Sequence, residues 1–355
     1  MSDFFEIDFL EVGNAKSGDA IPLRYSLNGE IYIHVVDGGF QDTGEKLIHH
    51  IKKYYDSPSY IDAVVVTHPD GDHAGGLRKL FESFEIGQLW MLRPWLYVDE
   101  LIDRFKRFRS AENLAKRLKE LYPNIAALEE LAEEHNVPIY EPFQGARIGE
   151  FVVLSPSKEF YLDLIIESEK TPEATKAAQE SFLEATGKLI KKAVAFIRSA
   201  WGEEIFPEED TSPENNMSVV QYANLCQTKI LLTGDAGRAA LKEAIEYAPL
   251  VGVDFPGIDR IQVPHHGSRH NVSTEILDEL IGPKLGSIQE NFSAIISAAK
   301  DDKDHPRKAV IRAFMHRGGK VVTTEGKTLR TGHNAPYREG WSTAEALPYP
   351  EDQEE

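Results

Sequence analysis

Short apolar runs alternate with longer amphipathic stretches along this chain, and their spacing predicts two strand-rich halves. In the first half we expect strands near 5–12, 20–26, 30–36, 61–67 and 87–92, with a helix at about 44–56. In the second half we expect strands near 217–223, 228–233, 260–264, 293–298 and 320–323, with helices at 237–247, 273–281 and 306–317. Strand-rich halves that are each followed by helices predict an α/β fold, an αββα sandwich with helices covering one face of each sheet.

Two further helical stretches interrupt this pattern. One is expected at about 99–135, and the other is a helical insertion at about 157–212 that consists mainly of a long helix from Pro172 to Ala200. We therefore expect one domain over residues 1–335 and a C-terminal tail over 336–355 with an acidic end.

Composition limits the class of protein. A chain of 355 residues with 41% hydrophobic content can bury a large core. No apolar run approaches the roughly 20 residues that cross a bilayer, and the first residues lack the basic and apolar regions of a leader. The single cysteine, Cys226, lies in an apolar run and is expected to be a buried, inert thiol. We expect a cytoplasmic protein with no membrane association.

The formal net charge of −19 is harder to combine with a nucleic-acid partner, because such proteins usually present a basic surface to phosphate. One segment departs from this balance. Between Arg104 and Lys119 all charged residues except Glu112 are basic, and apolar residues recur at helical spacing, which predicts an amphipathic helix with a basic outer face. Either these cations pair with neighbouring acids, or they form a wall that binds phosphate.

Metal-capable side chains follow directly after a buried-type strand in the first half. The β-branched run Ala63–Val66 leads into His68, Asp70, Asp72 and His73, and Pro69 and Gly71 impose an irregular loop. Such a loop can aim imidazoles and carboxylates at one point, and this mixed ligand set suits Zn, Mn or Fe better than Ca or Mg. A polar turn in which Asp72 caps the next helix is the alternative. Four ligand-type residues within six positions favour half of a two-metal site.

The segment from Thr67 to Gly76 resembles the first metal motif of the metallo-β-lactamase superfamily, in the variant whose second histidine is aspartate. That variant is similar to the soluble hydrolase domain of ComEC-type DNA-uptake proteins and to their stand-alone relatives. Further segments match in the expected order over residues 5 to about 330: 9–13, 17–21, 36–39, 215–220, 231–235, 263–268 and 304–306. The resemblance implies an αββα metallo-β-lactamase fold with helical insertions and a dinuclear metal site where the sheets meet at one edge.

The second half offers the remaining candidates, each after a predicted strand. The resemblance implies that Asp235 bridges the two metals. His265 and His266 are paired imidazoles between Pro and Gly, and we expect His266 to be the ligand and His265 to lie near the scissile group. His305 is a further ligand, a proton donor to the leaving group, or a surface histidine.

This chain also departs from the family pattern. Many superfamily members have a third histidine for the first metal between the two motifs, whereas this chain has Asn215-Asn216-x-Ser218 and no histidine from 136 to 264. Oxygen ligands in place of imidazole shift the expected ion from Zn toward Mn. The same departure argues against a β-lactamase. We expect Asn216, Ser218 and Ser268 to contact the substrate.

The predicted chemistry is hydrolysis with two divalent metal ions, Zn or Mn, that bridge a hydroxide. Asp72 would orient the water, and His265 or His305 would protonate the leaving group. A phosphodiesterase or nuclease is the leading hypothesis, with nucleic acid or a nucleotide as substrate. A hydrolase of a small nucleotide, ester or lactone is the first alternative. The second is a non-catalytic module of a multiprotein complex, with a protein partner encoded in a phage-defence operon.

Overall fold

Two seven-stranded mixed sheets form the centre of the computed structural model, which describes residues 2–105, 108–168, 170 and 195–355. The first sheet has the order β17-β1-β2-β3-β5-β7-β8, formed by Leu329–His333, Phe4–Phe9, Ala20–Leu27, Glu30–Gly38, Ala63–Val65, Leu89–Trp90 and Ile139–Tyr140. The second has the order β16-β15-β14-β13-β12-β10-β9, formed by Gly319–Thr323, Phe292–Ile296, Arg260–Gln262, Thr228–Leu232, Val220–Leu225, Phe151–Ser155 and Arg147–Ile148.

Each sheet combines antiparallel and parallel pairs in the same arrangement. β1, β2 and β3 pair antiparallel, after which β5, β7 and β8 continue in parallel. In the second sheet β9, β10, β12 and β13 pair antiparallel, and β14, β15 and β16 continue in parallel. The carboxyl ends of the parallel strands therefore gather at one edge, where the loops after β5, β13 and β14 carry the candidate chemistry.

Three apolar clusters separate four layers. One lies between the sheets and includes Phe5, Ile7, Val36 and Leu232, while the other two lie between a sheet and its covering helices. β3 and β5 contribute to both sides, because Val35 and Val64 face the helices whereas Val36 and Val65 face the other sheet. This double burial explains the unbroken apolar runs of these strands. The predicted αββα sandwich is confirmed.

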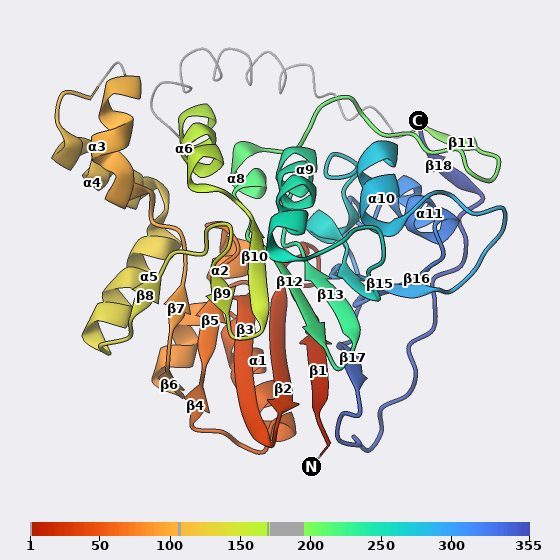
Figure 1. Cartoon of the computed structure of the whole chain (residues 1–355), viewed down its shortest axis with the longest axis horizontal. Helices are drawn as coiled ribbons and strands as arrows, with labels where there is room; N and C mark the ends of the chain where they lie inside the picture. Colours follow the sequence, from red (N-terminus) through yellow and green to blue (C-terminus); the bar gives the residue numbers. More distant parts are fainter. Residues whose placement is uncertain (1, 106–107, 169, 171–194) are drawn as a thin grey trace.

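Helices cover the outer faces of the two sheets (Figure 1). On the first sheet they are α1 (Thr43–Tyr54), α2 (Gly71–Ala74), η1 (Leu77–Glu82), η2 (Pro94–Tyr97), α3 (Val98–Leu101), η3 (Ile102–Arg104), α4 (Ala111–Leu121), α5 (Pro123–Glu134) and α6 (Lys158–Glu167). On the second they are α8 (Pro213–Asn216), α9 (Arg238–Tyr247), η4 (Ala248–Val251), η5 (Pro264–Gly267), α10 (Thr274–Ile281) and α11 (Lys308–His316). No helix within the described part of the chain has both the length and the apolar composition of a bilayer span.

The expected helix from Arg104 to Lys119 is wrong in its first half. η3 ends at Arg104, Phe105 has an extended backbone and is buried in the core, and α4 begins only at Ala111. Ser110 sets this start, because its hydroxyl accepts a hydrogen bond from the Asn113 amide as an N-cap. Burial of Phe105 and the cap at Ser110 together outweigh the helical periodicity of the segment.

Part of the expected helical insertion can also be compared with the structure. α6 is helical as predicted, but most of the long helix predicted from Pro172 to Ala200 lies outside the described residues. Its last residues are not helical: Phe196–Arg198 form β11, which pairs antiparallel with β18 (Asp352–Glu354). The short strands β4 (Tyr60–Ile61) and β6 (Glu85–Ile86) form another two-stranded sheet.

The C-terminal residues differ from the expected free tail. Gln353 and Glu354 are buried, and the two Glu354 carboxylate oxygens accept hydrogen bonds from the first amides of α11, at Lys308 and Ala309. Arg338 is also buried, where it pairs with Glu6 and Asp8 of β1. Residues 336–355 therefore belong to the folded chain.

Candidate metal centre

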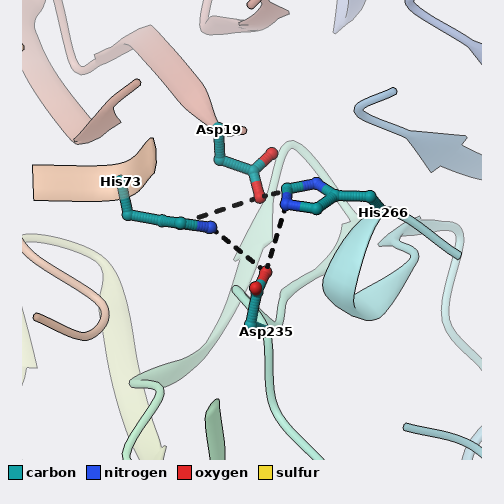
Figure 2. A group of neighbouring side chains, drawn as sticks. All are labelled: Asp19, His73, Asp235 and His266. Carbon is teal, nitrogen blue, oxygen red and sulfur yellow. Dashed lines mark ion pairs between the residues drawn. The ribbon is translucent and has the colours of Figure 1, made fainter. Parts of the chain in front are cut away.

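Four buried side chains from four separate loops converge at the edge where the sheets meet (Figure 2). Asp19 precedes β2, His73 lies on the short helix α2 after β5, Asp235 follows β13, and His266 follows β14. One ligand atom of each side chain lies within 4.8 Å of the corresponding atoms of the other three. Two carboxylates and two imidazoles at this spacing form a donor set that suits a transition metal ion.

The closest contacts centre on the Asp235 carboxylate. Its Oδ1 atom lies 3.2 Å from His73 Nε2 and 3.8 Å from His266 Nε2, while Asp19 Oδ2 lies 3.9 Å from His266 Nδ1. Within the described residues, Asp19 Oδ1, His73 Nε2, Asp235 Oδ1 and both His266 ring nitrogens are buried and have no hydrogen-bond partner. Buried polar atoms without partners are costly, and a cation between them would satisfy this group together.

The tautomer of His73 follows from its outer neighbour. His73 Nδ1 lies 2.7 Å from Asp37 Oδ2, at the end of β3, and an ionised carboxylate can only accept. Nδ1 therefore carries the proton, and in the neutral ring Nε2 presents a lone pair to Asp235. Asp37 is itself held by the amide of Thr67 at 2.8 Å and its hydroxyl at 2.6 Å. A carboxylate that orients a histidine in this way is typical of metal sites.

His68 is oriented through the same residues. The Thr67 hydroxyl donates its only proton to Asp37, so its oxygen must accept from His68 Nδ1, which lies 3.1 Å away. His68 Nε2 thus carries a lone pair as well. This atom is buried without a hydrogen-bond partner among the described residues, 3.9 Å from Asp235 Oδ2.

The pKa values in the group reflect its two buried carboxyl groups, of Asp19 and Asp235, and the nearby carboxylate of Asp72. Burial would raise the pKa of Asp235, but the charges of His73, His265 and His266 outweigh it and hold that pKa well below its usual range. Burial would lower the pKa of His266, but Asp235, Asp72 and Asp19 raise it to about 9. Protons on the histidines therefore balance the carboxylates here, a role that a divalent cation would take over.

Asp72 and Asp70 occupy different places. Asp72 lies at the rim, with Oδ2 3.8 Å from His266 Nε2, and its main-chain carbonyl accepts from the Asp19 amide at 3.1 Å. Burial would raise the pKa of Asp72, but His266 and His73 lower it, so that its carboxylate stays ionised. Asp70 is instead paired with Lys170 Nζ at 2.6 Å.

The other predicted site residues surround this group. His265 Nε2 lies 3.5 Å from Asp235 Oδ2, and the His305 ring lies 5.4 Å from that of His265. His305 Nδ1 contacts Asp302 at 3.3 Å, and burial together with the charges of His266 and His265 lowers the pKa of His305 to about 4. The Ser218 hydroxyl accepts from the Asp235 amide at 3.1 Å, which fixes the loop that carries this carboxylate.

The side chains of Asn216 and Ser268, which we expected to contact the substrate, form hydrogen bonds within the protein. The Asn216 side chain accepts a hydrogen bond from the Ala240 amide and donates one to Asp210. Of the two consecutive asparagines, it is Asn215 that contacts His265. The Ser268 hydroxyl accepts from the amide of His270 at 3.3 Å.

Sequence reasoning did not single out Asp19 or Asp37 as site residues. Asp19 directly precedes β2 and Asp37 lies at the end of β3, both in segments whose matches to the family were recognised, but a lone aspartate beside a strand has many other uses. One local signal was present at Gly18. A Cβ atom there would lie 2.6 Å from the Asp72 carbonyl oxygen, so a glycine allows the two loops to approach.

Part of the chain matches a known protein family. Residues 32–142 match the model of the Metallo-beta-lactamase superfamily. No curated protein matches the chain significantly. Similar solved structures include the metallo-beta-lactamase fold protein YhfI from Bacillus subtilis, at 11% identity and a TM-score of 0.40 over 94% of this chain and 100% of that chain. A metallo-beta-lactamase from Hirschia baltica is similar at 14% identity and a TM-score of 0.32, over 78% and 90%.

A third similar structure is the E377D mutant of CmlA beta-hydroxylase, at 12% identity and a TM-score of 0.41 over 94% of this chain. This chain spans only 54% of that one. The family match and the two mixed sheets flanked by helices define an α/β metallo-β-lactamase fold. Residues 32–142 thus match the metallo-β-lactamase superfamily, and the chain carries a buried His/Asp group that could hold metal.

Proposed function

We propose that this protein is a hydrolase of phosphodiesters that depends on two divalent metal ions, Zn or Mn. The observation that carries the proposal is the convergence of imidazole lone pairs on one carboxylate. His73 Nε2 faces Asp235 Oδ1 and His68 Nε2 faces Asp235 Oδ2, and hydrogen bonds through Thr67 and Asp37 fix both tautomers. Lone pairs that face a carboxylate repel it unless a proton or a metal cation lies between them, and a divalent cation would take the place of such protons.

Divalent ions at such a site would lower the pKa of a water and stabilise the charge that develops on an attacked phosphoryl group. The surrounding residues would orient the water, accept its proton and fix the Asp235 carboxylate. Asp72 stays ionised at the rim, where its carboxylate can orient a water and accept its proton. Asp235 is held by Ser218 through its amide and by Asn271 through its carbonyl, so its carboxylate is fixed before a substrate binds.

A small diester fits the surface better than a long nucleic acid. The basic segment had two possible roles, pairing with neighbouring acids or binding phosphate, and several of its cations form ion pairs, between Arg104 and Asp163, Arg117 and Glu120, and Lys119 and Glu129. Paired cations have fewer counterions to release when a polyanion binds. With a net charge of −19, the protein is suited to a nucleotide-sized substrate. The resemblance of the His68–His73 motif to ComEC-type hydrolase domains supports the phosphodiester class.

The test is a hydrolysis panel with Mn²⁺, Zn²⁺ and Mg²⁺ on bis(p-nitrophenyl) phosphate, cyclic nucleotides, RNA, and single- and double-stranded DNA. Asp235→Asn should lower kcat/KM on any cleaved diester by at least ~100-fold, because the bridging carboxylate is lost. Asp99→Asn, on the exposed face of α3, is the matched control and should retain full activity. Hydrolysis of lactones or thioesters without any diester would refute the substrate class. No hydrolysis with any metal would refute the enzyme.

A further inference from the structure

We propose that a second ligand site, separate from the metal centre, lies where the edge strands β16 and β17 border one cavity, and that it binds a small organic phosphate with an apolar body. The shape of this cavity and the charges that line it support this assignment. Binding there does not depend on the proposed hydrolysis.

The C-terminal segment after β17 closes the side of the sandwich and leaves a cavity beneath it. This segment runs along one side of the molecule to β18 (Figure 1). Arg338 fixes it to Asp8 of the first sheet, and the Leu347 amide donates to the Val321 carbonyl of the second sheet at 2.8 Å. Between these attachments, residues 340–345 cover a cavity of about 740 Å³ whose other walls come largely from β15, β16 and β17. This volume is typical of small-molecule sites, which span about 300–1,000 Å³.

The inner wall of the cavity is the edge of the core between the two sheets. Four apolar residues of that core line it: Phe9, Ile295, Val322 and Leu329. Tyr54 and Trp341 add aromatic surface, with their ring centroids 5.5 Å apart. Apolar surface is stabilised when a ligand displaces water from it. The cavity therefore favours a ligand with an apolar body.

A polar row crosses the same face of the second sheet. Ser293 of β15 is the register partner of Arg260 in β14 and of Lys320 in β16. Because side chains alternate along a strand, Ser293 and Lys320 lie on the same face as Ile295 and Val322, toward the first sheet. The inner faces of packed sheets are normally apolar. A lysine at this position therefore needs a polar partner.

This row lies at the opposite end of the strands from the metal centre. Arg260, Ser293 and Lys320 are the first or second residues of β14, β15 and β16. Asp235 and His266, in contrast, follow the carboxyl ends of the parallel strands β13 and β14. All residues that line the cavity lie outside the metal centre. A ligand can therefore bind here while the metal centre is occupied.

Cations outnumber anions in the lining of the cavity. The lining contains three basic residues and one acidic residue: Lys320, Lys327, Arg330 and Glu345. This excess contrasts with the net charge of −19 of the whole chain. Within the described residues, neither lysine ammonium has an ion pair or a hydrogen bond, whereas Arg330 pairs with Glu6 at 2.5 Å. A phosphate monoester carries a charge of about −1.5 to −2 at pH 7 and balances this excess better than one carboxylate does.

Thr331 supplies a hydroxyl donor beside these cations. Its oxygen lies 2.9 Å from Arg260 Nε, and a guanidinium can only donate. The hydroxyl oxygen therefore accepts, and its own proton can be donated to a phosphate oxygen. Lysine ammonium groups bind phosphate as point charges. We expect Lys320 and Lys327 to hold the phosphate group, Thr331 to orient it, and the apolar wall to contact the body of the ligand.

Lysines at edge strands have another use, because they keep an exposed edge from pairing with a second chain. Lys320 lies on the edge strand β16, and Lys327 lies between β16 and β17. Protection of an edge requires no ligand. The two explanations therefore differ in whether the cavity binds an anion saturably.

The experiment is isothermal titration calorimetry of the full chain with phenylphosphonate, an analogue of an organic phosphate whose P–C bond resists hydrolysis. Excess EDTA keeps metal out of the metal centre, so that phosphonate bound to a metal ion does not contribute. Wild type should bind one phenylphosphonate per chain saturably. The same binding event should be present in Zn²⁺-loaded protein. Inorganic phosphate should bind at least ~10-fold more weakly, because it has no apolar body.

Lysine variants locate the binding event. Lys320→Met and Lys327→Met each remove one cation and keep an apolar side chain, and each should raise Kd about 10-fold, as expected for a lost hydrogen bond to a charged group. Lys116→Met, at an exposed position of α4, is the matched control with the same loss of charge and should leave Kd within about twofold. Lys327 lies on an exposed loop, so its variant keeps the test decisive if Lys320→Met folds poorly.

Several results would overturn the site or its ligand class. No saturable binding to wild type, or binding that requires Zn²⁺, would exclude the site, and so would an unchanged Kd in both folded lysine variants. Phenylacetate or inorganic phosphate that binds as tightly as phenylphosphonate would exclude the organic phosphate. These results leave the proposed hydrolysis untouched, because the metal centre uses other residues.

Discussion

Arg338 is expected to hold the C-terminal segment onto the first sheet, and its replacement by methionine should be strongly destabilising. The guanidinium donates to both Asp8 oxygens, at 2.7 and 2.8 Å, and to Glu6 Oε2 at 2.8 Å. Both carboxylates are fully buried on the outer face of β1. Methionine keeps most of the side-chain volume but leaves buried negative charge with one cation fewer.

The magnitude follows from the partners that remain. Removing one member of a buried ion pair costs roughly 3–5 kcal/mol, because the other charge stays buried and uncompensated. Glu6 would keep Arg24 at 2.6 Å and Arg330 at 2.5 Å, and Asp8 would keep the Tyr55 hydroxyl at 2.7 Å and His50 at 3.1 Å. These neighbours place the expected loss at the lower end of that range, at about 3 kcal/mol.

Urea unfolding at pH 7 measures this loss. Arg198→Met is the matched control, since the Arg198 side chain is exposed and its ion pair with Glu351 is long, at 3.6 Å, so that its loss should cost less than ~0.5 kcal/mol. Combining Asp8→Asn with Arg338→Met should restore part of the stability, because the uncompensated charge is removed. A loss below ~1 kcal/mol for Arg338→Met would refute the reasoning.

Three further predictions concern buried residues of the first sheet and the site. Burial lowers the pKa of His34 to about 4, against 6.5 in the unfolded chain, so the free energy of unfolding should be highest above pH 6.5 and fall by about 3 kcal/mol as the pH drops to 4. Urea unfolding of His34→Gln should lack this part of the pH dependence. Equal pH dependence of the unfolding free energy in wild type and His34→Gln would contradict the prediction. Asp37→Ala removes the partner of His73 Nδ1 and should weaken metal binding by about 10- to 100-fold in equilibrium dialysis; unchanged affinity would count against the assigned tautomer. Asp72→Ala should abolish diester hydrolysis and leave the melting temperature of the metal-free protein nearly unchanged, because this side chain lies at the rim; full activity would remove its proposed role.

The local sequence was enough to predict the strands and helices in which apolar residues recur in a regular pattern. The run Ala63–Val66 predicts a strand covered on both faces, and Val64 and Val65 indeed face different apolar clusters. The same reasoning missed partners that are distant in sequence. β11 pairs with β18 across more than 150 residues, and no local pattern in Phe196–Arg198 indicates a strand. Glu6 and Asp8 alternate with phenylalanine and isoleucine as in a half-exposed strand, but Arg338 from the far end of the chain covers them.

The candidate site shows the same division. His73 was predicted from the density of ligand-type residues in its own loop, His266 from the paired imidazoles after a predicted strand, and Asp235 from the resemblance to the family. Asp19 joins them only because Gly18 lets its loop meet α2, which is a property of the fold. Asp70 was predicted as a ligand from the same dense loop, but its carboxylate is paired with Lys170. Proximity in sequence therefore identifies the loop but not the contacts that each of its side chains makes.

The central claim is that Asp19, His73, Asp235 and His266 enclose a divalent metal ion. A crystal of the protein grown with Zn²⁺ and measured above and below the zinc absorption edge tests it most directly. We expect an anomalous peak within about 2.0–2.2 Å of His73 Nε2 and of an Asp235 oxygen. A map without a peak there, in which His73 Nε2 donates a hydrogen bond to Asp235 Oδ1, would contradict the claim.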